Sequence, residues 1–219
     1  MLRFFGILAC LIGIRIRRYI HVCVVILRDR SGNTTTTLDR VSTMLSRAQE
    51  LLDQCNIQIC VESVNFLTNR DLMSGVHCGV RQLVSREYHW FEEHACKRPL
   101  FASSKPLTLY FVDSMADANA CTIPRTSYAV LTDGANGASM VHELGHHADL
   151  THRDDSQNIM FAEPSDTKDK LTKWQCCMIR TSAFLSEAWK CEKRSLKDRL
   201  SEVRGYYARQ NRNKTGGRN

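Results

Sequence analysis

Two histidines, His142 and His146, stand four residues apart in a stretch whose apolar residues recur at helical spacing. Four residues make about one helical turn, so both imidazoles point to the same side of the predicted helix and can share a metal ion. Glu143 lies beside them, where its carboxylate can act on a water molecule at that metal. The residues that cap this helix and face the core are close by: Asn136 as the cap, then Met140, Val141, Leu144 and Ala148.

A third histidine, His152, follows six residues after His146. This spacing is too long for the same helical face, so His152 reaches the metal only if the helix stops and the chain turns back. Asp149 stands where the helix must stop, and Asp tolerates the left-handed backbone that such a turn needs. Three neutral histidines leave a tetrahedral zinc ion one open position for water, whose pKa falls to about 7. The spacing therefore predicts a zinc site that hydrolyses amide bonds at neutral pH.

This pattern resembles that of the metzincin metallopeptidases, H-E-x-x-H-x-x-G-x-x-H followed by a methionine turn, with His142, Glu143, His146 and His152 at matching positions. Asn-Ile-Met at 158–160 looks like the methionine turn, and its methionine lies eight residues past the third histidine, as in the matrixin branch. The resemblance implies that the three histidines hold Zn²⁺ and that Glu143 is the catalytic residue. It also implies that the methionine forms an apolar floor under the metal.

Asp149 departs from the family pattern, which has glycine at this position. Two interpretations stay open: Asp149 forms the turn that brings His152 to the metal, which we favour, or Asp149 is itself a ligand. His147 points about 100° around the helix from His146 and is interpreted as an exposed neighbour rather than a ligand. Four other histidines fit no metal-binding spacing and are interpreted as ordinary surface or core residues: His21, His77, His89 and His94. Glu92 and Glu93 are interpreted as part of a solvated helix face.

Strand and helix patterns alternate along the chain around this motif. Apolar and alternating runs predict strands over residues 19–27, 56–66 and 107–112, and helical spacing predicts helices over 38–52 and 81–96. Such an alternation predicts an α/β fold with a mainly parallel sheet and right-handed crossovers.

The resemblance adds detail to this fold class. It implies an α/β (α+β), metzincin-like fold with a twisted, mainly parallel sheet, an antiparallel edge strand, an active-site helix and a C-terminal helix over 171–185. Residues 127–132 would be the edge strand, against which an extended peptide lies antiparallel. Residues 161–166 would wall the pocket for the substrate side chain after the cut.

The chain has 219 residues, of which 43% are hydrophobic, so it has room for one substantial core. No apolar run reaches the roughly 18 to 20 residues that span a bilayer as a helix. We expect a catalytic domain over 19–186, between an N-terminal segment over 1–18 and a basic tail over 187–219. The N-terminal segment is apolar and then basic, and it is interpreted either as a secretion signal or membrane anchor, or as an added buried strand.

Ten cysteines, an even number, favour an oxidising compartment. We therefore expect disulfide bonds and a protein that is secreted or held in the cell envelope. The sequence leaves the pairing open, except that the adjacent Cys176 and Cys177 would be strained if joined to each other.

The net charge is +7, and residues 189–219 hold ten Lys or Arg against three acidic residues. The tail is interpreted as a solvated helix that frays, which we favour, or as a docking segment for an acidic partner or an anionic surface. A nucleic-acid partner is not favoured, since the sequence has no helix-turn-helix, zinc-knuckle or stacked-aromatic motif.

The leading hypothesis is a zinc-dependent endopeptidase that acts on protein or peptide substrates. An alternative within the hydrolases is a zinc amidase on a non-protein amide such as a peptidoglycan cross-link. A third hypothesis, from another class, is a metzincin-fold binding or effector protein that acts through its basic tail.

Overall fold

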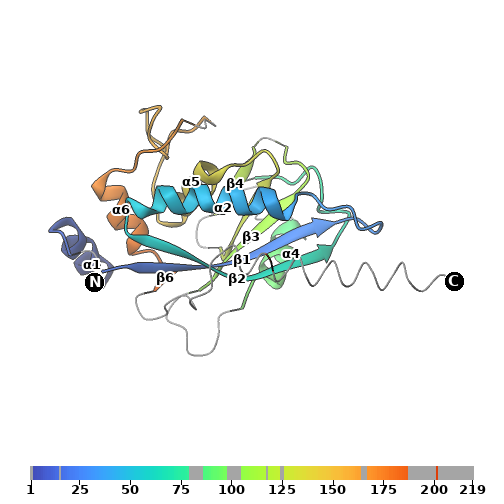
Figure 1. Cartoon of the computed structure of the whole chain (residues 1–219), viewed down its shortest axis with the longest axis horizontal. Coiled ribbons are helices and arrows are strands. Elements are labelled where there is room, and N and C mark those ends of the chain that lie inside the picture. The colour runs from blue at the N-terminus through green and yellow to red at the C-terminus, as the bar shows by residue number, and fades with distance from the viewer. Residues whose placement is uncertain are drawn as a thin grey trace.

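A computed structural model describes residues 2–14, 16–78, 86–97, 105–116, 118–123, 126–163, 167–186 and 201. Helices α2 (Leu38–Asp53) and α5 (Gly137–His147) run along one face of a twisted sheet (Figure 1). Helix α4 (Arg86–His94) packs through Phe91 in a second apolar cluster with other side chains of the sheet.

The sheet has the strand order β2-β1-β3-β5-β4, and β6 pairs with β1 outside this order. Its strands are β1 (Arg18–Arg28), β2 (Ile57–Thr68), β3 (Leu107–Val112), β4 (Ala120–Thr122), β5 (Tyr128–Thr132) and β6 (Leu185–Ser186). Strands β2, β1, β3 and β5 are parallel, whereas β4 is antiparallel to β5 and β6 is antiparallel to β1. The predicted α/β fold with a mainly parallel sheet and an antiparallel edge strand is confirmed.

Both faces of the central strand β1 are buried, because successive side chains of a strand point to opposite faces. Val22, Val24 and Ile26 belong to the main core, which also contains the inner faces of α2 and α5. Val25 and Leu27 belong to the second cluster, with α4. The continuous apolar run of this strand follows from its two covered faces.

The strands predicted over 19–27, 56–66 and 107–112 are β1, β2 and β3. The helix predicted over 38–52 is α2, and its cap Thr37 accepts a hydrogen bond from the Arg40 backbone N–H.

Two predicted helices end earlier in the structure. The one predicted over 81–96 is described as helix α4, and residues 79–85 lie outside the described chain. The C-terminal helix predicted over 171–185 is α6 (Lys173–Arg180). It ends early because the chain then returns to the sheet as β6.

The residues predicted as the edge strand, 127–132, do not lie at the edge. They form β5, which pairs with β3 on one side and with β4 on the other. The antiparallel edge strand is β4, whose Cys121 pairs with Val130. Three residues are too few for an alternating pattern to appear, and only the pairing with β5 makes this segment a strand.

The N-terminal segment forms a helix, α1 (Leu2–Leu11), and not the added strand that the sequence left open. It lies beside α6 at one end of the molecule (Figure 1). A Cβ on Gly6 would lie 3.1 Å from Cγ2 of Thr181, so the absence of a side chain lets α1 come close to the end of α6. No helix in the described part of the chain is long and apolar enough to cross a membrane.

Four disulfides join cysteines that are far apart in the described chain: Cys10–Cys177, Cys23–Cys96, Cys55–Cys176 and Cys78–Cys121. Cys60 is disulfide-bonded as well. The adjacent Cys176 and Cys177 are therefore not joined to each other, as predicted. This number of disulfides indicates an oxidising environment.

Several predictions fall on residues that the structure does not describe. The basic tail over 187–219 lies outside the described residues except for Ser201, as do residues 164–166 of the predicted pocket wall. The division of the chain into a domain over 19–186 and two flanking segments stays a prediction.

The close approach of α5 to α2 predicts that Gly137→Ala destabilises the protein. A Cβ at this position would lie 2.6 Å from the backbone nitrogen of Ala48 and 2.6 Å from Cβ of Arg47, so the two helices must separate. Overpacking of this kind costs about 1–3 kcal/mol. We expect a loss of that size in the free energy of unfolding in urea. Gly134→Ala is the control, since the nearest neighbours of its Cβ would be side-chain atoms of Asn119 and Thr132, at 3.2 Å or more. Equal stability of both variants would contradict the prediction.

Candidate metal centre

Helix α5 carries the first two histidines and begins at the predicted cap. Oδ1 of Asn136 accepts a hydrogen bond from the Ser139 backbone N–H at 2.8 Å, and Oγ of Ser139 accepts one from the Asn136 N–H at 3.3 Å. This capping box fixes the first turn. The predicted apolar stripe is buried in the main core, which fixes the rotation of the helix and thus the direction of His142 and His146.

The helix stops where the sequence requires it to stop. Asp149 has a φ of +64°, in the left-handed region, and is one of two non-glycine residues with positive φ in the described chain. Its N–H bonds to the carbonyl of His146 at 3.0 Å, and the N–H of Leu150 bonds to the carbonyl of Gly145 at 3.0 Å. These two bonds form a Schellman motif with Asp149 in the place usually taken by glycine. The prediction that Asp149 makes the turn is confirmed.

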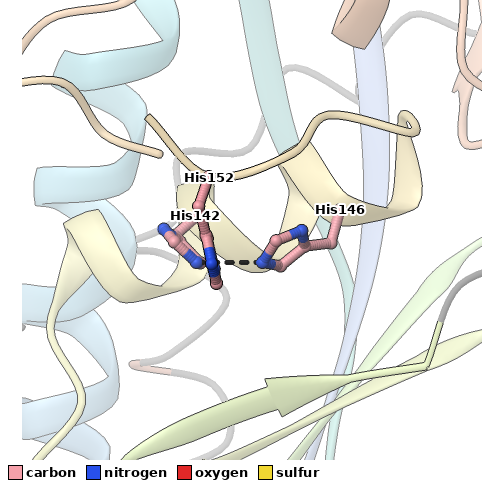
Figure 2. A group of neighbouring side chains, drawn as sticks. All are labelled: His142, His146 and His152. Carbon is pink, nitrogen blue, oxygen red and sulfur yellow. Dashed lines mark hydrogen bonds between the residues drawn. The ribbon is translucent and has the colours of Figure 1, made fainter. Parts of the chain in front are cut away.

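The turn brings His152 back to the two helical histidines, as Figure 2 shows. One nitrogen from each of the three rings lies within 4.8 Å of the other two. The Nε2 atoms of His142 and His146 are 3.0 Å apart. Tetrahedral zinc with Zn–N bonds of about 2.0–2.1 Å would set two such nitrogens about 3.3 Å apart. The arrangement therefore fits a metal ion.

The other ring nitrogens are held by backbone carbonyls. Nδ1 of His142 lies 2.7 Å from the carbonyl oxygen of Ile159, and Nδ1 of His146 lies 2.9 Å from that of Leu150. A carbonyl only accepts, so both Nδ1 atoms must donate, which leaves a lone pair on each Nε2 of the neutral rings. Two lone pairs that face each other at 3.0 Å can both bind one metal ion.

Burial keeps these rings neutral at physiological pH. Desolvation lowers the pKa of His142 to about 4 and also lowers the pKa of His146, although the carbonyl bonds act in the opposite direction. Neutral imidazole is the form that binds metals.

Asp149 is not placed to be a ligand. Its carboxylate Oδ2 lies 2.5 Å from Nη1 of Arg3 in α1, and it is absent from the cluster of metal-binding side chains found among the described residues. The alternative that Asp149 coordinates the metal therefore finds no support in the geometry.

Met160, which the resemblance assigns to an apolar floor under the metal, packs against the helix that carries His142 and His146. It is fully buried, and a Cβ on Gly145 would collide with its sulfur atom. Gly145 is the residue between the two helical histidines that lets this side chain reach the helix. Met160 thus packs against α5 at Gly145, one residue before His146.

A buried pair of amides supports this turn, and the sequence analysis missed it. Asn158 accepts the backbone N–H of Met160 at 2.9 Å and exchanges two hydrogen bonds with the side chain of Gln175, at 3.0 and 2.9 Å. Gln175 is in the first turn of α6, where it forms a capping box with Thr172. The Thr-x-x-Gln spacing was the signal that could have found Gln175.

Glu143 lines the same cleft as the three histidines, a cavity of about 300 Å³. It is 6% exposed, and desolvation raises its pKa to about 8, while the Thr122 backbone N–H partly offsets that rise. The edge strand β4 forms another wall of this cleft, through Ala120, Cys121 and Thr122. Lys168 also lines it, and no motif or spacing in the sequence pointed to this residue.

The prediction that His147 is exposed was wrong. His147 is 8% exposed, and its Nε2 lies 3.1 Å from the Tyr128 carbonyl oxygen and 2.5 Å from Oγ1 of Thr122. It is buried because β4 and β5 cover this side of α5. His147 is absent from the cluster of candidate metal ligands in the described chain, as predicted.

Glu92 was predicted to lie on a solvated face of its helix, but in the structure it is bonded to another segment. Its carboxylate accepts hydrogen bonds from the backbone N–H and the hydroxyl of Ser127, both at 2.9 Å, just before β5. His21 is an ordinary core histidine, paired with Glu62 at 2.6 Å.

The chain is similar in structure to metalloproteinase-II from Bacteroides fragilis, with 11% sequence identity and a TM-score of 0.49. The match covers 78% of this chain and 57% of that one, so the chain spans little more than half the length of this neighbour. No family model matches the sequence, and no curated protein matches it.

The left-handed turn predicts opposite effects of two substitutions at Asp149. Asp149→Gly keeps the required φ, so we expect zinc affinity within about threefold of wild type, because the exposed pair with Arg3 contributes little. Asp149→Val places a β-branched residue at positive φ, so the turn should open and zinc affinity should fall at least about tenfold. Competition with a fluorescent chelator measures both affinities. Equal zinc affinity of the two variants would show that the turn does not control His152.

Proposed function

We propose that this chain is a zinc-dependent endopeptidase of the metzincin type. The observation that carries the proposal is the convergence of His142, His146 and His152 beside a buried Glu143 in one cleft. The three imidazoles would hold the metal. A histidine triad with an open fourth position favours zinc, which supplies Lewis acidity and a water of lowered pKa when bound.

Glu143 is the proposed general base and acid. Its carboxylate is next to the metal-binding side chains and is shielded from solvent, and burial favours its taking up a proton. It would accept the proton from the attacking water and later donate it to the leaving amine.

Strand β4 is the proposed docking edge for the substrate. It is the last strand in the sheet order and lines the cleft beside Glu143. An extended peptide can add to such an edge through backbone hydrogen bonds, which hold the scissile bond near the metal without demanding a particular sequence. The sequence analysis predicted this role for residues 127–132, which form β5. The proposal assigns it to β4 instead.

The disulfides support a protein that is secreted or held in the cell envelope. We further propose that residues 19–186 form the catalytic domain and that the basic tail over 187–219 is an accessory segment.

The test compares wild type with Glu143→Ala and the isosteric Glu143→Gln on a diverse peptide library, with products identified by mass spectrometry. We expect about one zinc ion per chain in all three proteins, because none of the three zinc ligands is changed. Loss of the general base should slow cleavage at least about a hundredfold in both variants. Glu93→Ala, an exposed position on α4, should cleave like wild type.

Two results would overturn the proposal. One is the absence of zinc from protein purified without chelators. The other is cleavage that Glu143→Ala retains. A zinc-loaded protein that cuts no peptide but digests a non-protein amide, such as a peptidoglycan cross-link, would identify the amidase alternative instead.

A further inference from the structure

Large apolar side chains are exposed together on the N-terminal segment. Of all such exposed residues in the described chain, only Trp174 lies elsewhere; the others are Phe4, Phe5, Leu8, Ile12, Ile14 and Ile16. Their exposed fractions run from 48% to 71%. A contiguous exposed apolar patch of this kind marks a binding surface.

The patch occupies one side of α1 and continues past its end. At about 100° per residue, Phe4, Phe5, Leu8 and the following Ile12 fall within about one third of the helix circumference. The opposite side of α1 is already used by the protein. Cys10 is bonded to Cys177, and the backbone at Gly6 packs against the end of α6.

Arg3 lies on the side of α1 that faces the protein. Its Nη2 donates to the carbonyl of Ala148 at 2.8 Å, and its Nη1 pairs with Asp149. The helix is therefore held in place by contacts that leave the apolar side outward.

The segment that carries the patch is basic. Residues 1–18 contain four arginines and no aspartate or glutamate, and one of the four, Arg3, is paired with Asp149 of the turn after α5. Of these, Arg17 is exposed and close to the exposed Ile16. Apolar side chains flanked by arginines suit the headgroup region of an anionic bilayer, where the apolar groups insert and the guanidinium groups meet phosphates.

We propose that α1 and the following isoleucines form a docking surface for anionic lipid membranes. The helix is about 15 Å long, half the thickness of a bilayer core, so it lies in the interface and does not cross it. Membrane contact would then hold the metal-centre turn, to which Arg3 is bonded, close to the lipid surface.

Flotation with vesicles tests this surface in the full chain. One vesicle set contains phosphatidylcholine alone, and the other contains phosphatidylcholine with phosphatidylglycerol. We expect wild type to float with the anionic set and salt to weaken the association. The triple variant Phe4→Ser, Phe5→Ser and Leu8→Ser should lose at least about tenfold in partition. Trp174→Ser, the exposed apolar residue outside the patch, should bind like wild type.

Peptide mapping of the Cys10–Cys177 disulfide shows whether each variant is correctly folded. Three results would overturn the proposal: equal partition of the triple variant and wild type, removal of residues 1–18 from the mature chain, or self-association through the patch in sedimentation without lipid. The last result would assign the surface to a second copy of this chain.

A separate observation concerns Lys168 in the catalytic cleft. Lys168 is 4% exposed and lines the same cavity as His142 and Glu143. Its ammonium donates to the carbonyl of Phe161 and lies 5.5 Å from the centre of the Phe161 ring. Lysines are rarely buried without an anionic partner.

No carboxylate in the described residues forms an ion pair with Lys168. Glu163, which is exposed, acts on it only through longer-range attraction. An ammonium group has three N–H donors, and the Phe161 carbonyl takes one of them. The cavity therefore holds a desolvated positive charge that an incoming carboxylate would match.

We infer that Lys168 selects substrates with an acidic side chain next to the scissile bond. This inference rests on the proposed peptidase function. The library assay above tests it through the residues found on either side of each cut. We expect enrichment of Asp and Glu at one of these positions in wild type, and a loss of at least about tenfold in that preference in Lys168→Met.

Lys168→Glu should reverse the preference toward Lys and Arg, and Lys170→Met, an exposed lysine bound to Gln157, should leave it unchanged. Binding to the Glu143→Ala protein separates the two proposals. A peptide with Asp beside the uncut bond should bind more tightly than its Asn counterpart, even without turnover. Cleavage without an acidic preference would refute the role of Lys168 and leave the peptidase intact.

Discussion

The left-handed backbone of Asp149 is the constraint on which the histidine cluster depends. A helix can align only two of the three histidines, and the third must come from a chain that reverses direction within three residues of Asp149. The Schellman bonds to the carbonyls of Gly145 and His146 enforce that reversal. Asp can adopt the left-handed backbone conformation, although glycine adopts it more easily. The turn therefore also depends on surrounding contacts that hold Asp149 in this conformation.

Those contacts come from parts of the chain that lie far from the motif. Ile159 orients His142 through its carbonyl, Met160 fills the space that Gly145 leaves open, and the Asn158–Gln175 amide pair ties this turn to α6. Helix α6 is in turn joined to the end of α2 by the Cys55–Cys176 disulfide. The histidine cluster is therefore held by the packing of α2, α5 and α6 together, although its ligands lie within eleven residues of each other in the sequence.

The sequence was informative where local physics decides the structure. The spacing of His142 and His146, the cap at Asn136 and the turn at Asp149 depend on neighbours within a few residues, and all three appear in the structure as predicted. The long strands were also readable. Both faces of β1 and β3 are buried, so their apolar runs are continuous, whereas β2 has partly exposed residues and was predicted from its alternation.

The rest depends on long-range pairing, which a single sequence does not reveal. Strand β4 is a strand only because it pairs with β5, and its three residues carry no period of their own. The burial of His147 depends on strands β4 and β5, which cover the side of α5 that carries this residue. Arg3 and the cysteine pairs join segments that are far apart in the sequence. The composition could therefore indicate disulfides without indicating their partners.

Backbone groups at both ends of α5 form hydrogen bonds with side chains. The side chains at the N-terminus are neighbours in the sequence, and the one at the C-terminus is far away in the sequence. At the N-terminus, Asn136 and Ser139 cap the helix locally. At the C-terminus, the guanidinium of Arg3 meets the Ala148 carbonyl, where the helix dipole also favours a positive charge, and it pairs with the carboxylate of Asp149. The helix that presents the exposed apolar surface is thus in direct contact with the turn that positions His152. A ligand acting on α1 therefore acts on the backbone that brings His152 to the other two histidines. It does so mainly through the Ala148 carbonyl, since the exposed pair with Asp149 contributes little. This contact is the physical route by which the proposed membrane docking and the proposed catalysis would be coupled.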